Sequence, residues 1–130
     1  MGSTLLLPRR GRTVEVVFTI GLGQRANLGG YLPALHHVDL IAGQILGAAA
    51  DRDAMGNPTT RVVARLTLRD GEQRGDQVTF RHRFENVRGS FYVRLRGTNT
   101  DVVAPQLDAP DVDPWADLWF YSNPIMVRVP

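Results

Sequence analysis

Two histidines and an aspartate lie within four residues of one another and could hold a metal ion. His36 and His37 are adjacent, and Asp39 follows two residues later. In a β-strand adjacent side chains point to opposite faces, so only His37 and Asp39 would share a face. A zinc site needs three or four ligands. We therefore interpret these three residues as surface or hydrogen-bonding polar groups.

A second set of oxygen ligands lies in residues 98–114, a segment with three prolines and four aspartates. Calcium accepts irregular sets of oxygen ligands from loops of this kind. Asp113 also precedes Pro114, the arrangement of a cap and first residue of a helical turn. The hypothesis is a weak Ca²⁺ site, and no other cofactor is predicted. Its candidate ligands are Asp101, Asp108, Asp111 and Asp113.

Arginine supplies all fifteen basic residues. Six arginines lie two or four residues apart on the polar side of three predicted strands. If those strands are neighbours, the guanidinium groups form one basic patch that could bind phosphate, nucleic acid or an acidic protein. A solvated sheet face with paired charges is the alternative. The near-neutral net charge of the chain favours that alternative, so nucleic acid is not an expected partner. The six residues are Arg61, Arg65, Arg81, Arg83, Arg94 and Arg96.

The charges are distributed unevenly along the chain. The net charge is +2, yet residues 1–96 sum to +6 and residues 97–130 to −4. Such a split could mark a basic face and an acidic loop.

Aromatic side chains gather near the C-terminal end of the sequence. Trp115, Trp119 and Tyr121 could form a sugar-stacking platform together with Tyr31. Large aromatics beside an apolar strand are more often structural. We expect Trp115, Trp119 and Phe120 to cap one end of the core.

Alternating apolar and polar residues predict the elements that position these groups. In the third strand Val62 faces inward and Arg61 outward, and Phe80 and Val93 face inward from the next two. Glycine and proline separate the strands at short intervals, which favours an all-β, two-sheet antiparallel β-sandwich, immunoglobulin-like or related, of about six to eight strands. The predicted strands are 13–20, 36–46, 59–68, 77–85, 90–97 and 124–129, with one short helical turn at 113–119.

Composition limits the classes of protein that remain. Cysteine is absent, which excludes disulfides and thiolate chemistry. No apolar stretch approaches the roughly 20 residues that span a bilayer, and no signal peptide is recognised. We expect residues 1–12 to be an N-terminal tail or expression remnant and residues 13–130 to be a single β-sandwich domain.

Three stretches carry a resemblance to a known family: HVDLIAGQI (37–45), SFYVRLRGTN (90–99) and DPWADLWFYSNPIMVRV (113–129). They resemble the C-terminal β-sandwich accessory domains of bacterial PHP-like and metallophosphoesterase-type phosphoesterases. The resemblance implies a module without hydrolytic residues of its own. It also implies a periplasmic or secreted setting, although the sequence itself leaves the compartment open.

The sequence contains no complete catalytic motif, such as G-x-S-x-G, H-E-x-x-H or a P-loop. We therefore predict a non-catalytic accessory or interaction domain, associated with a phosphoesterase-like protein. Its partner would be a catalytic domain of the same or a longer protein, or another protein, and a homo-oligomer stays open. The alternatives are a carbohydrate- or polyanion-binding module, and a small phosphoesterase-type enzyme whose site forms only in the fold.

Overall fold

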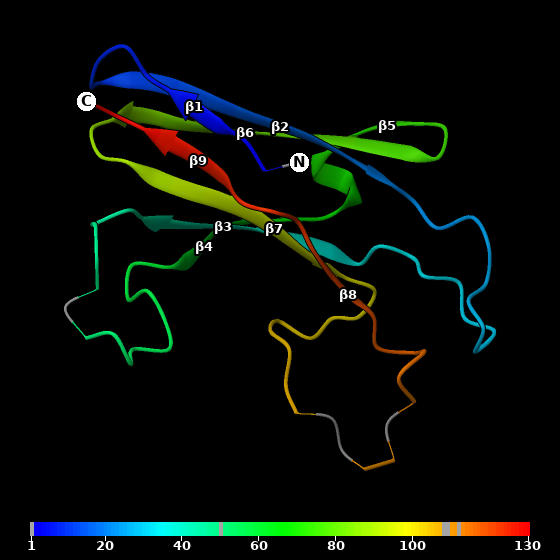
Figure 1. Ribbon diagram of the computed structural model, residues 1–130. Coiled ribbons are helices and arrows are strands. Elements are labelled where there is room, and N and C mark those ends of the chain that lie inside the picture. Colours follow the sequence, from blue (N-terminus) through cyan, green and yellow to red (C-terminus); the bar gives the residue numbers. More distant parts are fainter. Residues whose placement is uncertain (1, 50, 108–109, 112) are drawn as a thin grey trace.

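Two packed β-sheets make up the computed structural model, which describes residues 2–49, 51–107, 110–111 and 113–130 (Figure 1). The sheets form a sandwich and not a barrel, so the predicted all-β, two-sheet fold is confirmed. The larger sheet has the order β1 (Thr4–Leu6), β9 (Ile125–Arg128), β7 (Phe91–Thr98), β3 (His37–Gln44), β4 (Arg61–Leu66), and β8 (Trp119–Tyr121) also pairs with β7. The smaller sheet has the order β2 (Arg12–Gly21), β6 (Gln77–Val87), β5 (Glu72–Arg74).

Each of the six predicted strands corresponds to a strand of the structure. The described residues add three short strands, β1, β5 and β8, and one 3₁₀ turn, η1 (Leu68–Asp70). Within these residues no helix has the length and apolar character to cross a membrane.

β1 corrects the expectation that residues 1–12 form a tail. Thr4–Leu6 pair in parallel with Met126–Arg128, while every other strand pair is antiparallel. Beyond the strand, the Leu7 amide donates to the carbonyl oxygen of Arg128. Hydrophobic burial also holds the segment, because Leu7 packs against the core.

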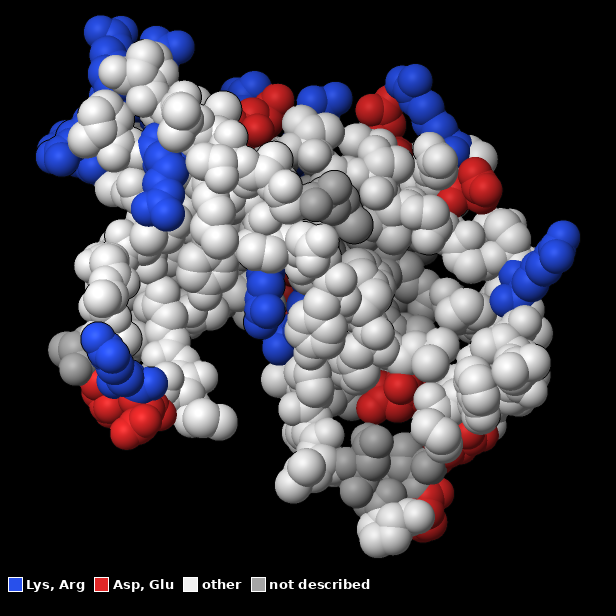
Figure 2. Space-filling view, in the orientation of Figure 1, with Lys and Arg blue, Asp and Glu red and all other residues white. Residues whose placement is uncertain are grey.

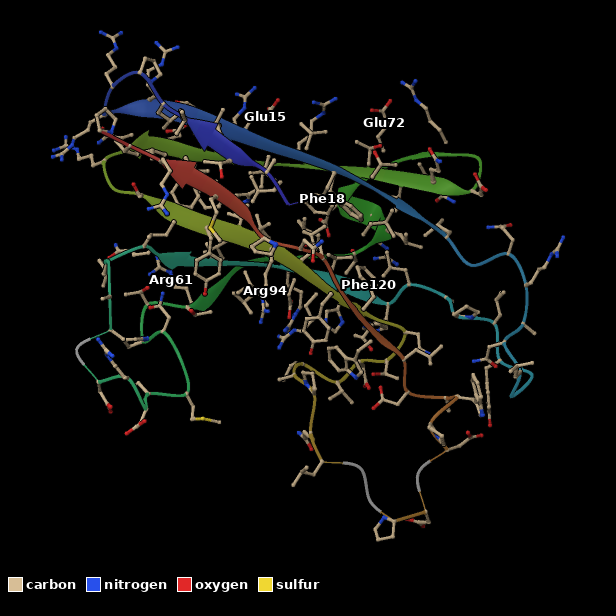
Figure 3. The ribbon with its side chains drawn as sticks, viewed as in Figure 1. Glu15, Phe18, Arg61, Glu72, Arg94 and Phe120 are labelled. Carbon is tan, nitrogen blue, oxygen red and sulfur yellow. The ribbon has the colours of Figure 1, made fainter. Side chains whose placement is uncertain are left out.

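The core lies between the sheets and is built from alternate residues, as the period-two pattern predicts. Phe80 of β6 and Leu40 of β3 are fully buried, and Val93 of β7 is 2% exposed. Phe18 of β2 stacks on Phe80 with ring centroids 5.3 Å apart, and Figure 3 shows Phe18 between the sheets. Burying each large apolar side chain contributes about 1.5–3 kcal/mol.

A bulge in the β3–β4 pairing reverses the predicted faces at the start of β4. The register shifts between Leu40 and Ile41, so Val62 pairs with Ile41 and Arg61 with Ala42. Val62 is consequently 41% exposed rather than inward. One extra residue exchanges the two faces of a strand, and alternation alone does not reveal where it is inserted.

At the predicted helical turn, 113–119, the structure has a turn at 114–116 but no helix. Asp113 does cap a turn, because its Oδ1 accepts from the Trp115 amide at 2.9 Å, but the chain then enters β8. Trp115 is 42% exposed and Phe120 38% exposed, so neither caps the core as expected. Trp115 instead packs against Gly29, where a Cβ atom would collide with its side chain.

Strand β3 is buried on both faces, which decides where polar chemistry can be enclosed. Val38 and Leu40 face the smaller sheet, whereas His37, Asp39 and Ile41 occupy the opposite, outer face. The segment 99–107 covers that outer face at Asp39, since both arginines that bind Asp39 also bind the Val103 carbonyl oxygen. A polar residue in the middle of this strand is therefore shielded from water.

Candidate functional site: two ion clusters and a basic end

Asp39 is the most deeply buried charge of the structure, with no exposed surface. Its neighbours across the ladder are Arg65 on β4 and Arg96 on β7, because β3 lies between these two strands. The Nε and Nη2 atoms of Arg65 donate to the two carboxylate oxygens at 2.7 and 3.0 Å. Nη2 and Nε of Arg96 donate to Oδ2 at 2.5 and 3.2 Å. Charge-assisted bonds of this kind are the strong ones.

The same two arginines hold the covering segment against the sheet. Arg65 Nη2 and Arg96 Nη2 donate to the carbonyl oxygen of Val103 at 2.9 and 3.1 Å. The Arg96 guanidinium also lies over the Trp119 ring, 5.6 Å from its centroid. We call Asp39, Arg65, Arg96 and the Val103 carbonyl the clip.

Ionisation of the clip follows from its contacts. Burial by itself raises the pKa of Asp39, but the hydrogen bonds from Arg65 and Arg96 outweigh it, and the pKa falls below its ordinary value of 3.8. Asp39 stays charged at neutral pH and has its oxygens filled by guanidinium groups. Asp39 therefore holds the neighbouring strands and the covering segment together, and it is poorly placed to transfer protons.

His37 lies beside the clip and is 2% exposed. Burial first, and the charge of Arg65 second, lower its pKa below the ordinary 6.5, against the opposite effect of Asp39. Nδ1 meets Nδ1 of His36 at 3.0 Å, and Nε2 is buried without a partner in the described residues. As predicted, His37 and Asp39 share a face. Within the described segments no group of three or more His, Asp or Glu side chains is arranged to hold a metal ion.

The six predicted arginines do not form one patch, because β4 and β7 belong to one sheet and β6 to the other. Arg65 and Arg96 are in the clip. Arg81 and Arg83 lie on the outer face of the smaller sheet, at 3.5 and 3.0 Å from the Glu15 carboxylate. Figure 3 shows Glu15 and Arg94 on opposite sides of the sandwich.

Arg94 and Arg61 have other surroundings. Arg94 is exposed and lies over the Tyr121 ring, 5.6 Å from its centroid. The β-bulge turns Arg61 toward a groove of about 500 Å³ between the sheets, whose lining includes His82 and Phe84. These two side chains are available to solvent but lie on different surfaces.

Five exposed arginines from three parts of the chain lie together at one end of the sandwich. We call this the basic end, and it was not predicted from the sequence. The Gly11 amide donates to the Val87 carbonyl oxygen, which joins the β1–β2 turn to the β6–β7 turn. Arg10 Nε donates to the Pro130 carbonyl oxygen at 2.9 Å, which brings in the end of β9. Figure 2 shows this cluster of blue groups at the upper left. None of the five forms an ion pair within the described residues. The basic end consists of Arg9, Arg10, Arg12, Arg88 and Arg128.

A local signal for this end was present in the sequence. Residues 9–12 read RRGR, the densest run of positive charge in the chain. Arg88 and Arg128 are distant in sequence. The pairing of β2 with β6 brings Arg88 near that run, and the pairing of β1 with β9 brings Arg128 near it.

Among the described residues, the hypothesised calcium ligands are not gathered into a group that could hold a metal ion. Asp113 is used by the turn at Trp115, and its hydrogen bond and charge raise the pKa of Tyr31. Asp101 and Asp111 are exposed. Asp108 lies outside the described residues.

The aromatic residues fall into two places. Trp119 and Tyr121 occupy the outer face of β8, next to Arg96 and Arg94. Trp115 and Tyr31 are joined through Asn27, whose side chain donates to the Trp115 carbonyl oxygen and accepts from the Tyr31 amide. The four aromatic residues of the candidate sugar-stacking platform therefore fall into two pairs with different surroundings.

Comparison with known proteins adds no family: no family model, no curated protein and no solved structure matches this chain.

Proposed function

We propose that this chain is a non-catalytic binding module with an immunoglobulin-like sandwich, which binds an anionic partner through its basic end. The strand order supports the fold part of the proposal. In their spatial order within the sheets, β2, β6 and β5 correspond to B, E and D, and β9, β7 and β3 to G, F and C, of immunoglobulin-type sandwiches.

The basic end is the observation that carries the proposal. Five arginines converge there without an acidic partner in the described chain, whereas the ion-paired arginines elsewhere are Arg65, Arg74, Arg81, Arg83 and Arg96. Guanidinium groups suit phosphate, sulfate and carboxylate because they donate in a planar fork. Arg9, Arg10 and Arg12 also line a hollow of about 410 Å³.

The non-catalytic part of the proposal is supported by the way the buried carboxylate is used. Asp39 accepts bonds from two arginines that also bind the covering segment. The resemblance to phosphoesterase accessory domains is compatible with such a module. In that case the basic end binds a catalytic domain or another protein with an acidic surface.

Binding to heparin and to inorganic polyphosphate, measured across a range of salt concentrations, tests the proposal. The variant Arg9→Gln/Arg10→Gln/Arg12→Gln should bind at least tenfold more weakly, and each lost phosphate contact should reduce the salt slope by roughly 1. The matched control Arg25→Gln/Arg52→Gln/Arg69→Gln removes the same charge from exposed arginines outside the basic end.

Two results would count against the proposal. One is no retention of the unmodified protein on either polyanion at low ionic strength. The other is an equal loss of affinity in both triple variants, which would mean that only net charge matters.

A further inference from the structure

Strand β2 has a long edge that pairs with nothing in the described chain. Its ten residues, Arg12–Gly21, pair with β6 on one side only. The other side presents the backbone N–H and C=O groups of alternate residues. Strands in this position usually carry proline, lysine or a bulge that prevents pairing. β2 has a register shift only between Arg12 and Val14, and from Val14 to Gly21 it has no proline. Its one charge in that stretch, Glu15, is paired with Arg81 and Arg83 of β6.

The smaller sheet also stops short of the larger one at this edge. Leu5 of β1 pairs with Val127 of β9, which is 1% exposed in the core, so both face inward. Leu5 is nevertheless 44% exposed, because the sheet opposite ends at β2.

A hollow of about 260 Å³ runs along the same edge. Val16, Val17, Phe18 and Thr19 of β2 all line it. Successive side chains point to opposite faces, so four consecutive residues can share one hollow only where it follows the backbone edge. Val93 and Ile125 contribute apolar surface from the larger sheet.

We propose that this edge receives an extended segment of a partner protein as an additional strand of the smaller sheet. Main-chain hydrogen bonds to β2 would supply affinity, and side chains at alternate positions would enter the hollow and cover Leu5. Those side chains must be aliphatic, because the surface they meet is apolar. Every pair in this sheet is antiparallel, so the added strand is antiparallel as well.

The charge of the segment follows from what lies at the end of β2. An antiparallel strand ends, at its C-terminal side, beside Arg12 and the neighbouring Arg9 and Arg10. The partner segment therefore has aliphatic residues at alternate positions, followed by acidic residues. This last step rests on the proposed function of the basic end, while the strand addition does not.

A second copy of the chain fits the edge less well. The inward side chains of its β2, Val14, Val16 and Phe18, are already packed in their own core. Two β2 strands placed side by side would thus put no side chain into the hollow.

The test uses the whole chain and a labelled peptide, Thr-Val-Thr-Val-Thr-Val-Thr-Glu-Glu. We expect saturable binding by fluorescence anisotropy and slower amide hydrogen exchange in residues 14–19. A peptide of the same composition with its valines consecutive should bind at least tenfold more weakly. N-methylation of alternate peptide residues should abolish binding in one register and spare it in the other, because only one set of N–H groups faces β2.

A variant of the protein separates the hollow from the basic end. Ser3 is exposed and lines the hollow, and its backbone carbonyl oxygen accepts from the Met126 amide. Ser3→Trp should fill the hollow and lower peptide affinity at least tenfold while leaving polyphosphate binding unchanged. The Arg9→Gln/Arg10→Gln/Arg12→Gln variant should lose polyphosphate and keep part of its affinity for the peptide.

The outcomes distinguish the two proposals. Peptide binding with protection of β2, but without polyphosphate binding, would sustain strand addition and overturn the function of the basic end. Equal binding of both N-methylated peptides, unchanged exchange in β2, or no peptide binding would overturn strand addition. So would a dimer whose β2 is protected without peptide, since the edge would then belong to a second copy.

Discussion

Each sheet carries on its outer face a carboxylate held by two arginines, and the two clusters differ chiefly in what covers them. Asp39 is wholly buried, and its partners Arg65 and Arg96 have side chains 37% and 13% exposed. Glu15 has a side chain 34% exposed, and those of Arg81 and Arg83 are 58% and 69% exposed. The two clusters use the same chemistry and differ in their surroundings: Asp39 lies on a strand paired on both sides and under the chain at Val103, whereas Glu15 lies on an edge strand.

Covering an ion cluster changes what it does for the fold. In water, paired charges on a sheet face contribute little because solvent screens them. Under a covering segment, each member becomes costly to remove because the remaining charges stay buried. The Asp39 cluster therefore makes attachment of the segment a condition of stability, whereas the Glu15 cluster mainly keeps its face soluble.

Removal of the buried carboxylate should give the largest effect. Asp39→Ala leaves Arg65 and Arg96 without a counter-charge, and we expect a loss of about 3–5 kcal/mol in the free energy of unfolding. Urea denaturation measures it. The matched change Glu15→Ala should cost at most about 1 kcal/mol. Equal losses in the two variants would contradict the comparison.

Weakening the clip without removing its charge should have an intermediate effect. Arg96→Lys loses the planar fork on Asp39 and the contact with Trp119, at a cost of about 1–3 kcal/mol. The control Arg94→Lys changes an exposed arginine over Tyr121 and should cost under about 1 kcal/mol. Limited proteolysis should cut within 99–107 sooner in Arg96→Lys alone. If both variants are cut at the same rate, the clip does not hold the segment.

Acidification should give the smallest effect and should act through His37. Because the folded pKa of His37 lies below its ordinary 6.5, the unfolded chain takes up the proton first. Stability from the neutral ring is complete above about pH 6.5 and is lost as pH falls through the lower folded pKa. Asp39 contributes in the same direction only below pH 3.8.

Melting temperatures between pH 7.5 and 5 check this expectation. The unmodified protein should melt at a lower temperature as pH falls, and His37→Gln should show a shallower dependence. His82→Gln, which changes a partly exposed histidine of the other sheet, is the control. A slope unchanged in His37→Gln and reduced in His82→Gln would refute the assignment.

Local alternation predicted the strands because side-chain direction along a strand repeats every two residues. It could not assign strands to sheets, since that depends on pairings between distant residues. The six arginines were therefore expected on one face, whereas Arg81 and Arg83 lie across the sandwich from Arg65 and Arg96. The bulge that turned Val62 outward was hidden for a similar reason, because a bulge exists only relative to a partner strand.

The clip had a sequence signal that the period-two interpretation missed. In HVDLIAG, Asp39 stands inside a nearly continuous apolar run, which is typical of a strand buried on both faces. A charge at such a position is almost always paired. Arg65 and Arg96 could not be named as its partners, because the neighbours of β3 were unknown.

The pairing of the first strand with the last has a consequence for the order in which this protein folds. The Leu7 amide meets the Arg128 carbonyl oxygen, and Arg10 reaches Pro130 across 120 positions of chain. Contacts between such distant residues form late, because the intervening chain must first be ordered. During synthesis Leu5 and Leu7 have no partner strand until residues 125–128 leave the ribosome. The growing chain thus leaves these apolar side chains without their partner strand until β9 is available to pair with β1.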